Sequence, residues 1–203
     1  MAAEELIKGT EKARLGSCRA YYMLFDGATV PALEDIMKEE NLLGHSKGGA
    51  TVDYTPTFLE ERDDHGLVIK SALTEEAAKA SLGLFTWSAR SLAVLGPTTR
   101  VTEANGVRTA KIGGIKNNDG KKYVILLYHE DKADGDCWII IVGKNRNGFS
   151  ITFKNDNATT LNPEIHAEPM DSEGTLIEYN EKIVDATATE TKTEGEGEGE
   201  GEG

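Results

Sequence analysis

The chain has 203 residues, a length typical of one domain, and carries 22 Lys and Arg against 35 Asp and Glu. The formal net charge of -13 argues against tight binding to nucleic acid or to an anionic membrane surface, because phosphate contacts need cations. No apolar run approaches the roughly 20 residues of a membrane span, and the N-terminal MAAEELIKGTEKARLG has no signal-peptide core. We therefore expect a protein made in a bacterial-type cytoplasm, without a membrane partner.

The first third of the chain is rich in strand signals. A strand and turn are predicted by CRAYYMLFDGATVP, and two further strands by ATVDYTPTFLEE and HGLVIKSAL. Between the first two lies PALEDIMKEENLL, whose apolar residues at 33, 36 and 37 suit a short helix or an irregular strand and loop. Cys18 and Cys137 lack CxxC spacing and are expected to be reduced thiols that pack as small apolar side chains.

Residues 74–95 carry two helix signals of different quality. By propensity alone TEEAAKASL is helical, with Thr74 as its N-cap and acids in its first turn. The second signal is cleaner, because Ser88 can cap ARSLAVL, Gly96 can stop it and Pro97 follows. We expect a helix at the second segment and leave the first open on propensity grounds.

From Val107 onward strand signals are dense and separated by hairpin turns. The runs GVRTAKIGGI, KKYVILLYHED, DCWIIIVGK and FSITFK alternate with NNDG, KADG and NRNG, which predicts an antiparallel meander. PEIHAEP and TLIEYNEKI predict two further strands around a DSEG turn. YVILL and WIIIV lack alternation, so both are expected to be covered on both faces, by a helix on one side and by core or a neighbouring subunit on the other.

The C-terminus changes character abruptly. From Glu181 it holds eight acidic and two basic residues and almost nothing to bury, ending in alternating Glu and Gly. Such a segment cannot offset its ordering entropy, so the sequence predicts a folded body ending near residue 183 and a disordered acidic tail over 184–203.

Two short motifs resemble functional sites, one catalytic and one calcium-binding. GHSKG at 44–48 matches the G-x-S-x-G nucleophile elbow, with Ser46 as nucleophile. That motif requires a buried strand turning into a helix, whereas here strand-like sequence containing Pro56 follows, so we interpret it as a flexible Gly-rich loop. DKADGD at 131–136 has calcium-like acids but lacks the twelve-residue loop with its terminal Glu, so we interpret it as a solvated turn.

No catalytic or metal set emerges from the remaining residues. The four histidines share no metal-ligand spacing, and neither a phosphate-binding Gly-rich loop nor an acid pair nor a nucleophile with its base is evident. We therefore expect a protein that is not an enzyme and needs no cofactor or metal.

The order of several segments resembles a known family. ENLLGHSKGGATVDYTPTFLEERDDHGLVIK, LFTW, TTRVTEANGVRTAKIGG, DGKKYVILLYHEDKADGD, IVGKNRNGFSITF and DSEGTLIEY occur in sequence across residues 18–183. Together they resemble the major tail tube proteins of long-tailed bacteriophages and prophages of Gram-positive bacteria. The Glu-Gly tail departs from that family's pattern.

The resemblance implies a mainly β fold, an antiparallel β-sandwich or half-barrel with one flanking α-helix and a long loop arm. It covers the tail tube domain (18–183), which leaves an N-terminal arm (1–17) before it and the acidic tail (184–203), set apart by composition, after it. It also implies that TEEAAKASLGLFTW is a strand, against its helix propensity.

The implied function is structural. Six copies would form a ring, and stacked rings would form the tail tube of the virion, a conduit for DNA ejection. The implied partners are further copies of the chain, the tape-measure protein, the tail terminator, the baseplate or distal tail proteins, and DNA only in transit. The alternative is a tube of a contractile bacteriocin or injection machine that carries no DNA. Two other rivals are a hydrolase built on Ser46 and a monomeric carbohydrate- or surface-binding β-sandwich.

Two sets of candidate residues follow from this interpretation. The Gly-rich arm LLGHSKGGATVDYTPTFLEERDD (42–64) is the candidate inter-subunit loop, since a long loop with glycines can order on contact. Its candidate contact residues are Gly44, His45, Ser46, Lys47, Gly48 and Gly49. A channel wall that must not bind phosphates should be acidic. The candidate lumen acids, on turns of the meander, are Asp119, Asp131, Asp134 and Asp136.

Overall fold

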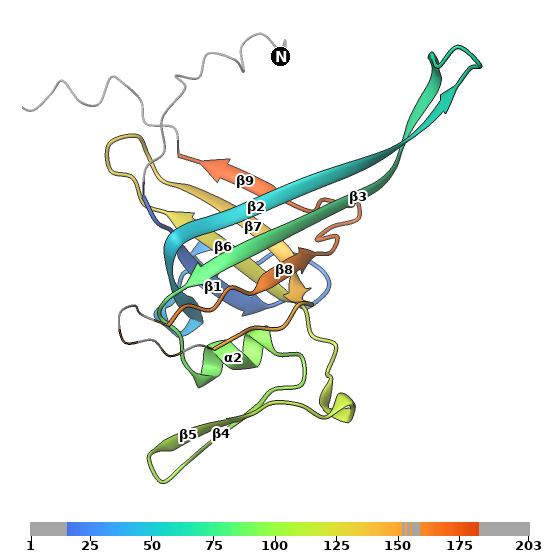
Figure 1. Cartoon of the computed structure of the whole chain (residues 1–203). Helices are drawn as coiled ribbons and strands as arrows, with labels where there is room; N and C mark the ends of the chain where they lie inside the picture. The colour runs from blue at the N-terminus through green and yellow to red at the C-terminus, as the bar shows by residue number, and fades with distance from the viewer. Residues whose placement is uncertain (1–15, 152, 154, 156–158, 183–203) are drawn as a thin grey trace, which may run out of the picture.

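A computed structural model describes residues 16–151, 153, 155 and 159–182 (Figure 1). Most of the expected N-terminal arm and all of the Glu-Gly tail lie outside these residues. The described chain is mainly β and antiparallel, which confirms the predicted fold class. Its strands are β1 (Arg19–Leu24), β2 (Leu42–Arg62), β3 (Val68–Leu84), β4 (Arg100–Ala104), β5 (Val107–Lys111), β6 (Tyr123–His129), β7 (Cys137–Asn145), β8 (Glu164–Ala167) and β9 (Glu178–Glu181).

The helices are short. They are α1 (Leu33–Ile36), α2 (Ala89–Leu95) and the 3-10 turns η2 (Glu39–Asn41) and η3 (Ile115–Asn117). Neither α-helix in the described part of the chain has the length and apolar character needed to cross a bilayer.

The main sheet closes on itself. Its strands follow the order β6-β1-β2-β3-β8-β7-β9, and β6 also pairs with β7, so six of them form a ring. Strand β9 pairs with β7 at residues 137–140, and β8 pairs with β7 further along at residues 143–145. The predicted sandwich or half-barrel is thus a curved antiparallel sheet whose two ends meet.

The interior of this barrel is the first core cluster. Alternate residues of every barrel strand contribute to it, including Ala80 of β3, Ile125 of β6 and Ile165 of β8, each at most 1 % exposed. Leu92 and Leu95 of α2 pack into the same cluster, and Figure 1 shows α2 lying across one end of the barrel. This is the flanking helix of the predicted fold.

Helix α2 forms where the sequence predicts it. The Ser88 hydroxyl accepts from the Arg90 amide, the Ser91 hydroxyl accepts from the Ser88 amide, and the helix ends at Gly96. Ser91 also donates to the carbonyl of Leu43 at 2.9 Å, which ties the helix to β2.

A second cluster covers the outside of β1, β6 and β7. Val124 and Leu126 of β6 and Val142 of β7 point outward and are buried against Ile36 of α1 and Met170. Both faces of β6 and of the middle of β7 are therefore buried, as the missing alternation in YVILL and WIIIV predicts.

The expected four-strand meander is wrong beyond one hairpin. Strands β6 and β7 pair as predicted, but β5 pairs with β4 in a separate two-stranded ribbon. Gly113 and Gly114, at φ 112 and 85, redirect the chain after β5. After β7 the Asn145 amide donates to the carbonyls of Leu95 and Gly148, which turns the chain, and the described residues of FSITFK form no strand.

The helix propensity of TEEAAKASL is overridden, as the resemblance implies. These residues belong to β3, where they pair with β2 across a long antiparallel ladder. Pairing along two strands satisfies their backbone groups in a way that a short isolated helix could not match.

Candidate inter-subunit surfaces

Strands β2 and β3 extend far beyond the barrel. They hold 21 and 17 residues, several times the usual strand length, and pair from Ser46↔Leu84 out to Arg62↔Val68. Every residue from 53 to 77 is exposed except Asp63. We call residues 53–77 the arm; ten residues of strand make it about 30 Å long, and Figure 1 shows it projecting away from the barrel.

The two faces of the arm differ in chemistry. In an antiparallel pair, two directly opposed residues point to the same face of the ribbon. Along each strand, every second residue points to that same face. Val52 and Ala80 oppose each other and pack in or against the barrel core, so their face continues outward through Tyr54↔Ala78 and Phe58↔Leu73. We call it the apolar face.

The opposite face is more polar, although it includes Leu59 opposite Ala72. It carries opposed Asp53 and Lys79 near the barrel and opposed Glu61 and Lys70 near the tip. Pairs of opposite charge suit a face that stays in water, whereas the apolar face repeats the pattern of a face that is normally covered.

The apolar face is uncovered in the single chain. Tyr54, Phe58 and Leu73 are 51 %, 56 % and 47 % exposed. A two-stranded hairpin has marginal stability in water by itself, and contiguous exposed apolar residues mark interaction sites. The arm therefore has the composition and shape of an element that a partner covers.

The predicted loop at Gly44–Gly49 is strand, not loop. Its residues lie in β2 at the wall of the barrel, between β1 and the end of β3. A side chain at Gly44 would meet the Thr86 carbonyl oxygen at 2.1 Å, and the His45 amide donates to the Thr86 hydroxyl. The glycines thus permit close strand packing here, which the loop interpretation overlooked.

Gly48 and Gly49 have a second role. Both have positive φ, 84 and 88, and the β2–β3 register shifts between Ser46 and Ala50. Such a bulge bends a strand and increases its twist. Lys47 and Gly48 are exposed at this irregularity, which lies between the barrel wall and the arm.

Ser46 lies inside the fold. It is 4 % exposed, its hydroxyl donates to the Cys18 carbonyl at 2.9 Å, and it accepts from the Cys18 amide at 3.0 Å. The residue sits in the course of a strand and not at a strand-to-helix turn, so the geometry of a nucleophile elbow is absent at this position.

The candidate lumen acids fall at two places. Asp119 precedes β6, whereas Asp131, Asp134 and Asp136 follow it, and β6 separates the two places by roughly 20 Å. Asp119 pairs with the Lys121 ammonium at 2.7 Å, and the hydrogen bond from Lys121 lowers the pKa of Asp119.

The acids after β6 organise their own turn. Asp136 accepts from the Lys182 ammonium at 2.6 Å, from the Tyr128 hydroxyl at 2.5 Å and from the Asp131 amide at 3.0 Å. These bonds, that of Lys182 first, lower the pKa of Asp136 to about 2. Asp131 in turn accepts from the amides of Ala133 and Asp134. Their part in a lumen stays a prediction.

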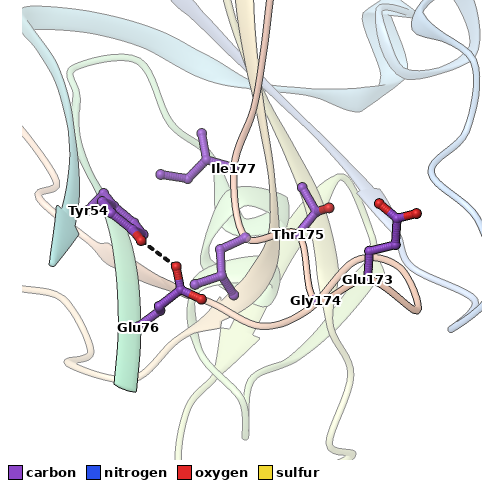
Figure 2. Close-up of a pocket in the computed structure, with 7 residues that line it drawn as sticks. Tyr54, Glu76, Glu173, Gly174, Thr175 and Ile177 are labelled. Carbon is purple, nitrogen blue, oxygen red and sulfur yellow. Dashed lines mark hydrogen bonds between the residues drawn. The ribbon is translucent and has the colours of Figure 1, made fainter. Parts of the chain in front are cut away.

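An open hollow of about 430 Å³ lies where the arm meets the barrel. Figure 2 shows Tyr54 and Glu76 of the arm on one side and Glu173, Thr175 and Ile177 on the other. The Tyr54 hydroxyl donates to the Glu76 carboxylate across the arm. The hollow combines acidic and apolar groups, so it can receive a side chain of a docked partner.

Sequence reasoning found the apolar face only in part, because the candidate arm at 42–64 includes Tyr54 and Phe58 but not Leu73. It placed strands on both sides of residues 63–67 but put the contact surface in the glycines. One sequence signal could have identified the whole arm. Two adjacent strand patterns that are much longer than the strands of a small barrel must extend beyond the barrel.

Within the part of the chain that the structure describes, no three His, Cys, Asp or Glu side chains are grouped as metal ligands would be. No protein-family model matches the sequence, and no curated protein matches it significantly.

Proposed function

We propose that this chain is a structural subunit that assembles with copies of itself into stacked hexameric rings, the tail tube of a long-tailed phage particle. The observation that carries the proposal is the arm, whose apolar face is exposed from Tyr54 to Leu73 although it continues the face that fills the barrel core. The resemblance of the sequence to tail tube proteins supports the same function.

The shape of the subunit favours a head-to-tail interface. An arm that leaves one side of a compact barrel cannot cover its own exposed face, and a surface elsewhere on a second copy can. Such heterologous contacts produce a closed ring when the rotation between copies closes, and a helical polymer when it does not. A tube of stacked rings contains both kinds of contact, because the copies close into a ring and the rings repeat along the tube axis.

In this proposal the particle's other proteins and DNA are transient or terminal partners. The tube would contain the tape-measure protein during assembly, would join a tail terminator and baseplate or distal tail proteins at its ends, and would let DNA pass without tight binding. The acids at the two ends of β6 would contribute to a phosphate-repelling wall. The protein would be located in the virion tail.

A tube of a contractile bacteriocin or injection machine is the second candidate. Such a tube would use the same barrel and arm. The acidic net charge of -13 does not distinguish a DNA-carrying tube from a tube without DNA, because a large net charge also favours solubility. Copurification of DNA-containing capsids with the native particle would distinguish the phage tail.

The test compares the full chain with a variant in which Asn-Gly replaces residues 56–76. We expect the full chain to form rings or tubes on concentration, visible by negative-stain electron microscopy, and the variant to stay monomeric. No residue from 56 to 76 belongs to either core cluster, so the variant should retain its far-UV circular dichroism minimum. Polymers formed by the folded variant, or a full chain that stays monomeric at every concentration, would contradict the proposal.

A further inference from the structure

The arm and the β4–β5 ribbon carry opposite charge. Residues 53–77 hold seven acidic and two basic side chains. Residues 97–117, which we call the basic ribbon, hold four basic side chains and one acidic one. In a chain with a net charge of -13 the ribbon is a local reversal of sign, and such complementary surfaces steer association and determine its register.

The charges of the basic ribbon are poorly balanced within one molecule. Arg100 and Lys111 lie directly opposite each other in the β4–β5 register, so they share a face. Like charges at opposed positions destabilise a strand pair. Among the described residues no ion pair joins either of them to an acid, whereas Arg108 pairs with Glu103 at 2.9 Å on the other face.

The face with Arg100 and Lys111 points away from the barrel. Val101 and Ala110 of the other face are half-buried, and Ala110 packs against the core that includes α2. The outer face also presents Val107, which is 61 % exposed, and the chain beyond β5 exposes Ile112 and Ile115 at 54 % and 92 %. The ribbon therefore combines cations with uncovered apolar side chains.

The apolar face of the arm carries acids beside its apolar side chains. Glu60 and Glu76 lie on the same face as Phe58 and Leu73, one acid toward the tip and one toward the barrel. Glu76 accepts from Tyr54 and Glu60 from Arg62, but a carboxylate has acceptor capacity for further donors. Arg100 and Lys111 oppose each other across the ribbon, whereas the two acids are separated along the arm, so the ribbon must cross the arm for each cation to reach one acid.

The two elements cannot meet within one chain. Figure 1 shows the arm and the β4–β5 ribbon extending from opposite ends of the molecule. An acidic arm at one end and a basic ribbon at the other require a second copy, and each further copy repeats the same contact.

We propose that the apolar face of the arm of one copy lies on the outer face of the basic ribbon of a second copy, with Glu60 and Glu76 paired to Arg100 and Lys111. This rests on the proposed self-assembly and names the two surfaces that it joins.

Charge reversal on each side tests the pairing. One variant carries Glu60→Lys and Glu76→Lys, and the other carries Arg100→Glu and Lys111→Glu. When either variant is present alone, like charges face each other across the contact. We therefore expect sedimentation velocity to show no rapidly sedimenting polymers for that variant. An equimolar mixture restores opposite charges at every contact, because each variant's arm then faces the other's ribbon, and should recover the polymers.

A matched control uses the same arm. Glu61→Lys with Glu75→Lys changes the net charge equally but alters the polar face, since Glu61 opposes Lys70 and Glu75 opposes Thr57. This variant should assemble as the unmodified chain does. Thermal unfolding of every variant reports whether it is folded.

The outcomes separate this inference from the function on which it rests. If the unmodified chain forms no polymer, the proposed function fails. If it polymerises and the folded reversal variants polymerise equally, or if their mixture remains monomeric, the arm does not dock on this ribbon, although the chain still assembles.

Discussion

At Glu168 three cations surround one carboxylate. The ammonium of Lys122 lies 2.6 Å from it, and Lys144 and Arg146 lie at 3.3 and 3.1 Å. The carboxylate is 15 % exposed. Hydrogen bonds from these groups, that of Lys122 first, lower the pKa of Glu168 from 4.5 to about 2. The site joins the chain before β6, the end of β7 and the segment after β8.

We expect Glu168→Gln to lower the free energy of unfolding at pH 7 by about 1 to 2 kcal/mol. The pKa difference would allow more, but the three cations are 35 to 54 % exposed and water screens them. The folded pKa lies below the unfolded one, so this stabilisation is complete above about pH 4.5 and is lost as the pH falls toward 2.

Urea denaturation between pH 7 and pH 2.5 measures this effect. The difference between the unmodified chain and Glu168→Gln should shrink as the pH falls. Glu173→Gln, which alters an exposed acid, serves as the control and should match the unmodified chain. A difference that is independent of pH would show that the carboxylate charge is not what stabilises this site.

At the scale of the element, the arm has two faces that differ in charge: paired opposite charges flank Leu59 and Ala72 on the polar face, whereas Phe58 opposes Leu73 on the apolar face. Phe58 lies on the apolar face and is 56 % exposed, and Thr55 lies nearby on the polar face. Neither residue belongs to a core cluster. Substitutions here should therefore change association without changing the stability of the barrel.

We expect Phe58→Asp to prevent polymer formation and Thr55→Asp, opposite Ala77, to leave it intact. Burying a new carboxylate in an apolar contact carries a desolvation cost, whereas the polar face stays in water. Both variants should keep the free energy of unfolding of the monomer within about 0.5 kcal/mol of the unmodified chain. Light scattering during concentration measures assembly, and equal behaviour of the two variants would contradict the assignment of faces.

At the scale of the whole molecule, closure of the barrel depends on a short strand. Strand β8 has four residues and links β3 to β7, so the ring is complete only through it. Ile165 of β8 is 1 % exposed and lies in the interior cluster. The barrel thus depends on a contact between residues about 85 positions apart along the chain, such as Lys79 with Glu164.

We expect Ile165→Ala to lower the free energy of unfolding by about 2 to 5 kcal/mol, because it leaves a cavity where three strands meet. Ile69→Ala removes the same atoms from a side chain that is 69 % exposed on the arm, and should cost less than about 0.5 kcal/mol. Urea denaturation of dilute, monomeric protein measures both. Similar losses at the two positions would mean that β8 does not close the barrel in solution.

The sequence by itself determined features that depend on neighbours along the chain. The cap at Ser88 and the stop at Gly96 mark the ends of α2, and the unbroken apolar runs of β6 and β7 indicate burial on both faces. These signals are local, because a helix cap and a buried strand each need only a few consecutive residues.

Only the tertiary structure decided which strands pair and what the glycines do. Strand β5 has hairpin signals on both sides, yet it pairs with β4, and Gly44 is required by the Thr86 carbonyl more than forty residues away. The arm is exposed because the barrel ends before β2 and β3 do, and no local sequence pattern indicates where the barrel ends. Pairing and packing are decided between residues distant in sequence, and their energies exceed the small propensities that a single segment reveals.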